Sequence, residues 1–150
     1  MAHLPTLASR PTALDLAERA YRRPSSTIWL HRVRVGTCRF EEALQFYVGT
    51  LGLALRTVEL DPGRSPYLRA VLVDAEARDV LELVEADGGA GGVAGAALHG
   101  LTFGLPRRAW QLLRTRLDTQ GYPYTLSPTV ITLHDADGLR LRVEPLDEGR

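Results

Sequence analysis

Arginine side chains at alternate positions of two segments are the residues of this sequence best suited to chemistry. Arg32 and Arg34 alternate with valines near the start of the main body, and Arg140 and Arg142 alternate with apolar residues near its end. A guanidinium keeps its charge and presents a planar fork of donors, which suits a carboxylate, phosphate, sulfate or enolate. The pattern predicts a site for an anionic or polyoxygenated small molecule.

Two further polar residues, Glu82 and Thr102, are expected on the same face as these arginines, since they lie in segments with the alternation of strands. On such a face Glu82 could act as a general acid or base, and Arg142 could help to stabilise a developing oxyanion. A plainer interpretation is also open. Glu82 would then pair with one arginine, while the other arginines are solvated on an open sheet face or lie in a dimer interface.

No other chemistry competes strongly with this cluster. Cys38 is the only cysteine, which excludes an intramolecular disulfide and a cysteine-built metal cage. It lies near the start of a predicted helix, whose dipole could lower the pKa of the thiol, but a lone thiol is more often inert. The serines lack the setting of a nucleophile elbow, and the Gly-rich segment 88–95 lacks the Lys-Ser/Thr of a phosphate loop.

The elements that must position these residues follow a βαβββ order in the first half of the chain. Residues 28–35 alternate like a half-buried strand, and apolar residues in 40–51 recur at helical spacing before Gly52, which tolerates positive φ. Three further strand-like segments follow, separated by turn-forming residues: 53–60, 68–73 and 80–84.

The same order returns after a Gly- and Ala-rich link at 86–97. Trp110, Leu113 and Leu117 mark a helix that Gly121 closes. Strands are predicted before and after that helix: 98–105, 125–126, 129–133 and 139–143. The sequence therefore predicts an α+β domain at 28–146, in which two βαβββ modules, 28–85 and 98–146, form a cupped mixed sheet around a cavity. Residues 1–27 are predicted to be an N-terminal extension made of a short helix and a linker.

Composition limits the range of partners. The chain has 150 residues, 45% hydrophobic and 24% charged, as expected for one soluble globular domain. Its 18 basic and 18 acidic side chains balance, so no net field would draw it to nucleic acid or an anionic membrane. The N-terminus lacks the pattern of a signal peptide, and no apolar run reaches membrane-spanning length. We expect a cytoplasmic protein with neither nucleic acid nor membrane as a partner.

Four segments of the chain resemble the vicinal-oxygen-chelate superfamily, which includes glyoxalase I, ring-cleaving dioxygenases, fosfomycin-resistance transferases and bleomycin-binding proteins. They are 30–36, the Phe-Tyr…Leu-Gly-Leu pattern within 43–53, Leu-Glu-Leu at 81–83 and Asp-x-Asp-Gly within 135–141. The resemblance extends over about 28–146. It implies the fold described above and a homodimer with pockets between modules.

Catalytic members of this superfamily hold one divalent metal with four side chains, usually His or Gln and Glu. Carried over onto this chain, the four ligand positions fall on Leu30, Glu82, Gly100 and Arg142, of which only Glu82 has a metal-binding group. The resemblance thus implies a cavity without a metal cofactor. If the strand register differs, an alternative remains in which His31, Glu82 and His99, with or without His134, bind one divalent metal.

Two classes of function follow from these expectations. The first is a metal-independent protein that binds a natural product for self-resistance or sequestration, similar to the bleomycin-resistance branch. Its expected ligand-binding residues are Leu30, Arg32, Arg34, Glu82, Gly100, Thr102, Arg140 and Arg142. The alternative is an enzyme of the same fold, either a metal-free cyclase or isomerase that uses Glu82 and Arg142, or a metal-dependent lyase, isomerase or dioxygenase. A structural or regulatory dimer with a filled cavity is a third possibility.

Overall fold

The computed structural model describes residues 30–63, 66–87 and 98–146. The chain divides after Leu30, and the following description concerns the unit that begins at His31. The predicted N-terminal helix and most of the Gly- and Ala-rich link lie outside the described residues. No helix in the described part of the chain is long and apolar enough to cross a membrane.

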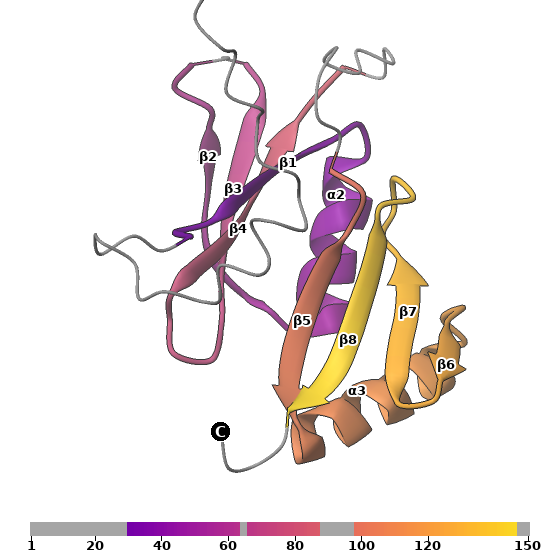
Figure 1. Ribbon diagram of the computed structural model, residues 1–150. Coiled ribbons are helices and arrows are strands. Elements are labelled where there is room, and N and C mark those ends of the chain that lie inside the picture. The colour runs from indigo at the N-terminus through magenta and orange to yellow at the C-terminus, as the bar shows by residue number, and fades with distance from the viewer. Residues whose placement is uncertain (1–29, 64–65, 88–97, 147–150) are drawn as a thin grey trace, which may run out of the picture. The chain divides into compact units, whose positions relative to one another are not determined.

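The first module has the predicted order of one strand, one helical segment and three strands (Figure 1). Its elements are β1 (Val33–Thr37), α2 (Phe40–Leu44), the π-helix η1 (Gln45–Leu51), β2 (Ala54–Leu60), β3 (Leu68–Val73) and β4 (Asp79–Glu85). The strands form a sheet in the order β1-β4-β3-β2, in which only β1 and β4 are parallel. The helical segment ends at Gly52, whose φ is +99° and whose N–H donates to the carbonyl of Tyr47.

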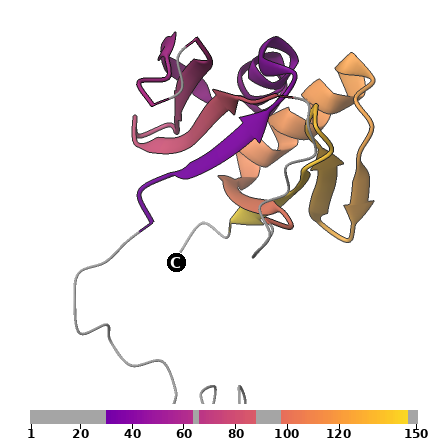
Figure 2. The same ribbon diagram turned by 90° about the horizontal axis from the view of Figure 1, so that it is seen from above.

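The second module repeats this order. Its elements are β5 (Leu101–Pro106), α3 (Arg107–Gln120), β6 (Thr125–Ser127), β7 (Val130–His134) and β8 (Arg140–Leu146), and its sheet order is β5-β8-β7-β6. Again only the first and last strands, β5 and β8, pair in parallel. Gly121 ends α3 with a φ of +63°, as its position in the sequence predicted. The α+β class and the two βαβββ modules are confirmed, with the eight strands divided between two four-stranded sheets (Figure 2).

One hydrophobic core serves both modules. Residues from β3 and β4 share a single buried cluster with residues from η1, α3, β7 and β8, and its fully buried members include Tyr47, Leu72, Leu81, Leu83, Leu117, Ile131, Leu133, Leu141 and Val143. α2 packs against β4, and α3 packs against β5 and β8. Burial of Val35, Leu141 and Val143 puts Arg34, Arg140 and Arg142 on the opposite sheet faces, as the alternation predicted.

Two β-bulges interrupt the first sheet. Leu55 pairs with Leu72 and Thr57 with Val71, so that Arg56 is an extra residue in β2. In β4, Val80 is the extra residue, because the register with β3 shifts between Leu81 and Asp79. An extra residue changes which face the neighbouring side chains occupy. The bulge at Val80 accordingly places Asp79 on the same face as Glu82, three positions later.

The two modules also share a turn. In the β3–β4 connection the Asp74 carboxylate accepts the N–H groups of Glu76 and Arg78, and in the β7–β8 connection the Asp135 carboxylate accepts those of Asp137 and Leu139. Each turn ends on a residue with positive φ, 59° at Ala77 and 85° at Gly138. Both are three-residue hairpin loops that need one left-handed residue. This equivalence strengthens the internal repeat beyond what the sequence shows.

Candidate functional site

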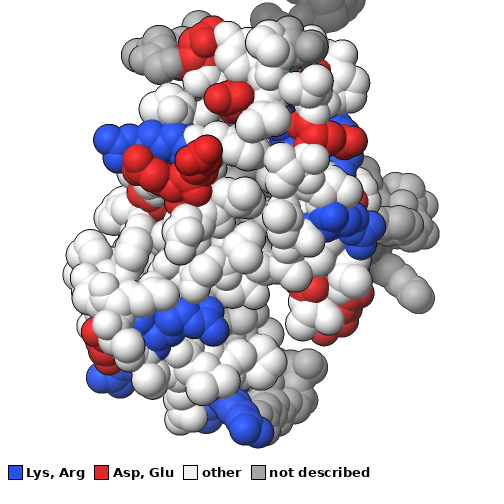
Figure 3. Space-filling model, turned by 180° about the vertical axis from the view of Figure 1, so that it is seen from behind, with Lys and Arg blue, Asp and Glu red and all other residues white. Residues whose placement is uncertain are grey.

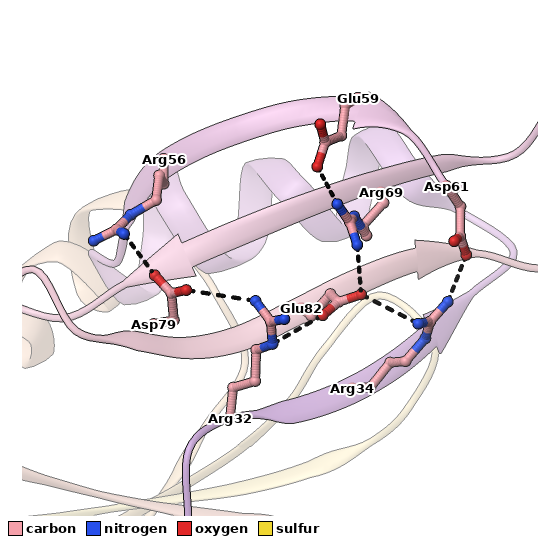
Figure 4. A network of polar contacts seen from close by, with 8 residues as sticks. All are labelled: Arg32, Arg34, Arg56, Glu59, Asp61, Arg69, Asp79 and Glu82. Atoms are coloured by element: carbon pink, nitrogen blue, oxygen red, sulfur yellow. Dashed lines mark hydrogen bonds and ion pairs between the residues drawn. The ribbon is translucent and has the colours of Figure 1, made fainter. Parts of the chain in front are cut away.

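A network of eight charged side chains lies on the face of the first sheet opposite the core (Figure 4). Its members are Arg32, Arg34, Arg56 and Arg69, with Glu59, Asp61, Asp79 and Glu82. Figure 4 shows all eight on one side of the strands, with a helix behind the sheet. Because four guanidiniums meet four carboxylates, the network as a whole is neutral.

Glu82 is the centre of this network. Its side chain is only 5% exposed, and its carboxylate oxygens lie 3.1 Å from Nε of Arg32, 3.3 Å from Nη1 of Arg34 and 3.8 Å from Nη1 of Arg69. A buried carboxylate is costly unless opposite charges compensate it, and three guanidiniums do so here. The sequence allowed for one arginine partner, whereas the structure gives Glu82 three.

Other carboxylates compensate the arginines at the two ends of the network. Asp79 contacts Arg32 at 3.4 Å and Arg56 at 3.2 Å, so it joins β4 to β2 and to the residue just before β1. The buried Asp61 accepts a hydrogen bond of 2.5 Å from Nη2 of Arg34. On β3, Arg69 donates to Glu59 of the neighbouring β2. Every arginine of this network therefore has at least one carboxylate partner.

The sequence identified only part of this network. Arg32, Arg34 and Glu82 were predicted to share a face, but five members of the network were missed: Arg56, Arg69, Glu59, Asp61 and Asp79. Alternation could have revealed Arg69, which lies on β3 beside buried valines and alanine. The bulges hid Arg56 and Asp79, because a simple period-two pattern does not anticipate an extra residue.

A second polar row crosses the face of the other sheet opposite the core. Thr102 of β5 pairs in register with Arg142 of β8, and Arg142 pairs with Thr132 of β7. One step along the face, Arg140 lies opposite His134. The sequence predicted Thr102, Arg140 and Arg142 for this face and missed Thr132, whose position depends on the register of β7 with β8.

The arginines of the second sheet have far less counter-charge than those of the first. Nη2 of Arg142 lies 3.1 Å from Oε1 of Glu144, and the two side chains are 46% and 43% exposed. No carboxylate pairs with the exposed Arg140 in the part of the chain that the structure describes. Figure 3 shows the molecule from behind. On that face, positive and negative side chains are intermixed and are separated by uncharged areas.

The four positions that correspond to metal ligands do not fit a metal. Leu30 is apolar and 80% exposed, and Arg142 is a cation. At Gly100, an added Cβ would lie 2.7 Å from the carbonyl oxygen of Arg140, so a larger residue there would require the strands to shift. Glu82 is already enclosed by guanidiniums.

The alternative ligand set is not assembled either. His31, His99 and His134 are all exposed. Within 30–63, 66–87 and 98–146, no three His, Cys, Asp or Glu side chains come close enough together to hold a metal ion.

The Asp-x-Asp-Gly segment joins the two modules. Asp135 accepts a buried hydrogen bond of 2.7 Å from the Tyr47 hydroxyl, and Asp137 accepts one from the Thr37 hydroxyl. Burial, together with the hydrogen bond to Asp135, raises the pKa of Tyr47 far above its ordinary value. These contacts assign a structural role to a motif that the sequence linked only to the family resemblance.

Cys38 belongs to the same junction. Both its backbone N–H and its thiol lie 3.2 Å from Oδ1 of Asp137. The hydrogen bond from the thiol to this carboxylate is the main cause that raises the pKa of Cys38. A lowering of this pKa by the helix dipole, considered from the sequence, is therefore wrong, and the thiol is poorly suited to act as a nucleophile.

Known structures with a similar fold were found, whereas no protein-family model and no curated protein sequence matches this chain. A glyoxylase/bleomycin resistance protein/dioxygenase domain from Frankia sp. EAN1pec is 19% identical with a TM-score of 0.66, over 83% of this chain and 96% of that one. A variant of the fosfomycin resistance protein FosX from Listeria monocytogenes, solved with Mn(II) and 1S,2S-dihydroxypropylphosphonic acid, is 11% identical with a TM-score of 0.59, over 80% and 93%. Glyoxalase I from Leishmania major is 14% identical with the same TM-score, over 79% and 87%. The chain therefore shares the fold of these glyoxalase and resistance proteins, which is the fold that the sequence resemblance implied.

Proposed function

We propose that this chain is a metal-independent small-molecule-binding protein of the glyoxalase/bleomycin-resistance fold. The observation that carries the proposal is the environment of Glu82. Of the four positions that correspond to metal ligands it alone has a metal-binding group, and three guanidiniums surround that group. A divalent cation at this carboxylate would have to displace or approach several like charges, which disfavours its binding.

Polar groups on the two sheet faces support a ligand that is anionic or rich in oxygen. Guanidiniums and hydroxyls donate hydrogen bonds, and Arg142, Arg140 and Thr102 present such donors on an exposed face. Two structures of similar fold are named for bleomycin or fosfomycin resistance, which supports sequestration of a natural product as the role. We further propose that the protein acts in the cytoplasm as a homodimer.

Metal content is the first test of this proposal. The protein should be purified without chelator and without metal-affinity resin, and its metals measured by elemental analysis. We expect far less than one metal ion per chain, and no heat of binding when Mn²⁺ or Zn²⁺ is titrated into the protein. A stoichiometric metal that is lost in Glu82→Gln would contradict metal independence.

Ligand binding is the second test. Anionic and polyoxygenated natural products should be screened for those that raise the unfolding temperature, since a ligand that binds only the folded state stabilises it. A binding protein returns its ligand unchanged. Conversion of the ligand, lost in Glu82→Gln or Arg142→Ala, would instead identify an enzyme of the same fold.

A further inference from the structure

The two sheets differ in how well their arginines are neutralised. On the first sheet, each of Arg32, Arg34, Arg56 and Arg69 contacts at least one carboxylate. On the second sheet, Glu144 is the only carboxylate paired with either Arg140 or Arg142 among the described residues. An anion that approaches the first sheet meets a neutral network, whereas one that approaches the second sheet meets an excess of positive charge.

The geometry of β8 suits a small anionic group. Arg140 and Arg142 are two residues apart on one strand, so they emerge on the same face about 7 Å apart along β8. Thr102 and Thr132 flank Arg142 on the neighbouring strands. Gly100 lies close to Arg140, its hypothetical Cβ 3.7 Å from that of Arg140, and adds no side chain that would cover this end of the row.

The ion pair between Arg142 and Glu144 is not an obstacle to a ligand. Both side chains are almost half exposed, and exposed ion pairs contribute little free energy. A ligand anion that gains two guanidiniums and a hydroxyl can therefore replace Glu144 as the partner of Arg142.

We propose that Arg140 and Arg142, flanked by Thr102 and Thr132, form a subsite for an acidic group of the ligand, a carboxylate or a phosphorus oxyacid. The arginines of the first sheet do not take this group, because their own carboxylates occupy them. This inference rests on the proposed function and narrows the ligand to a molecule that carries at least one anionic group.

The test titrates inorganic phosphate into the full chain at constant ionic strength and monitors the backbone signals by two-dimensional NMR. We expect saturable shifts of backbone signals in β5, β7 and β8. In Arg142→Ala binding should weaken roughly tenfold, as expected for the loss of one charge-assisted donor. The matched control is Arg56→Ala, which removes an arginine of similar exposure from the first sheet and should leave the phosphate affinity unchanged.

Glu144→Gln supplies a second, gain-of-binding test, since it removes the one competing carboxylate and should strengthen phosphate binding several-fold. Three results would each overturn the subsite. They are NMR shifts that grow linearly with phosphate concentration, NMR shifts centred on β1 and β4, and an Arg142→Ala variant that binds phosphate as tightly as wild type. Failure here is distinct from failure of the proposed function. A metal-free protein that binds only neutral ligands would keep the proposed function and lose the subsite. A protein with a stoichiometric metal that still binds phosphate at Arg140 and Arg142 would lose the proposed function and keep the subsite.

Discussion

Glu82 illustrates how one buried side chain depends on several partly exposed ones. Its carboxylate is 5% exposed, while its partners Arg32, Arg34 and Arg69 are 32%, 49% and 20% exposed. Removal of one member of a fully buried ion pair costs about 3–5 kcal/mol, and solvent screening of these arginines reduces that cost.

We therefore expect Glu82→Gln to lower the free energy of unfolding by about 1–3 kcal/mol, measured by urea denaturation. Glu59→Gln is the matched control, because Glu59 is 49% exposed and contacts only Arg69 in the network. It should cost less than about 1 kcal/mol. Equal losses in the two variants would show that Glu82 is not the centre of the network.

Tyr47, unlike Glu82, has its hydrogen-bond partner in the other module. Its buried hydroxyl donates to Asp135, so Tyr47→Phe should leave that carboxylate short of a hydrogen bond and cost about 1–3 kcal/mol. Tyr124→Phe provides the comparison, because the Tyr124 hydroxyl donates to Asp118 at an exposed site, where a smaller loss is expected.

The pH dependence of unfolding tests the same hydrogen bond. The pKa of Tyr47 is raised in the folded state, so this group binds its proton more tightly there than in the unfolded chain. Its contribution to stability is complete below the ordinary pKa of 10.0 and falls as pH rises above that value. Wild type should lose stability above pH 10.0 more steeply than Tyr47→Phe. Parallel curves would argue against a shifted Tyr47.

At the scale of the element, the two equivalent turns differ at one position. Ala77 and Gly138 both have positive φ, 59° and 85°, but only glycine adopts this conformation without strain. Ala77→Gly should stabilise the protein by up to about 1 kcal/mol after allowance for the greater freedom of the unfolded chain. Gly138→Ala should destabilise it by about the same amount, although no atom lies within 4 Å of the added Cβ. Thermal unfolding measures both, and changes of the same sign would contradict this account.

Most elements could be predicted from the sequence because each has a local signal. Helical spacing and the terminal glycines gave both helical segments, since Gly52 and Gly121 adopt positive φ where the helices end. Alternation gave the faces of β1 and β8. The π-helical turns of η1 had no such signal, because their hydrogen bonding depends on how the segment packs rather than on its apolar spacing.

The candidate site was less predictable because it depends on pairings between distant segments. Alternation assigns Arg34 and Glu82 to one face, but their contact with Asp61 and Arg69 follows from the order β1-β4-β3-β2. The neutral charge of the first face is a property of this arrangement. A count of arginines on single strands therefore overestimates the charge that is free to bind a ligand.

At the scale of the whole molecule, the shared core makes the modules interdependent. Leu72 and Leu81 of the first module are buried in one cluster with Ile131 and Leu133 of the second. We expect neither half, produced separately as 28–87 and 98–150, to show cooperative unfolding by circular dichroism, and we expect the mixed halves to regain it. Independent folding of either half would contradict a single core.

The bulge at Val80 also affects any alignment of β4 with a strand that lacks such a bulge. Val80 is inserted between Asp79 and Leu81 and has no partner on β3. An alignment that places no gap at this point shifts every residue on the N-terminal side by one and exchanges its inward and outward positions. Asp79 would then be matched with core residues, and a comparison based on such an alignment would miss the carboxylate that links β4 to β2 and to the residue just before β1.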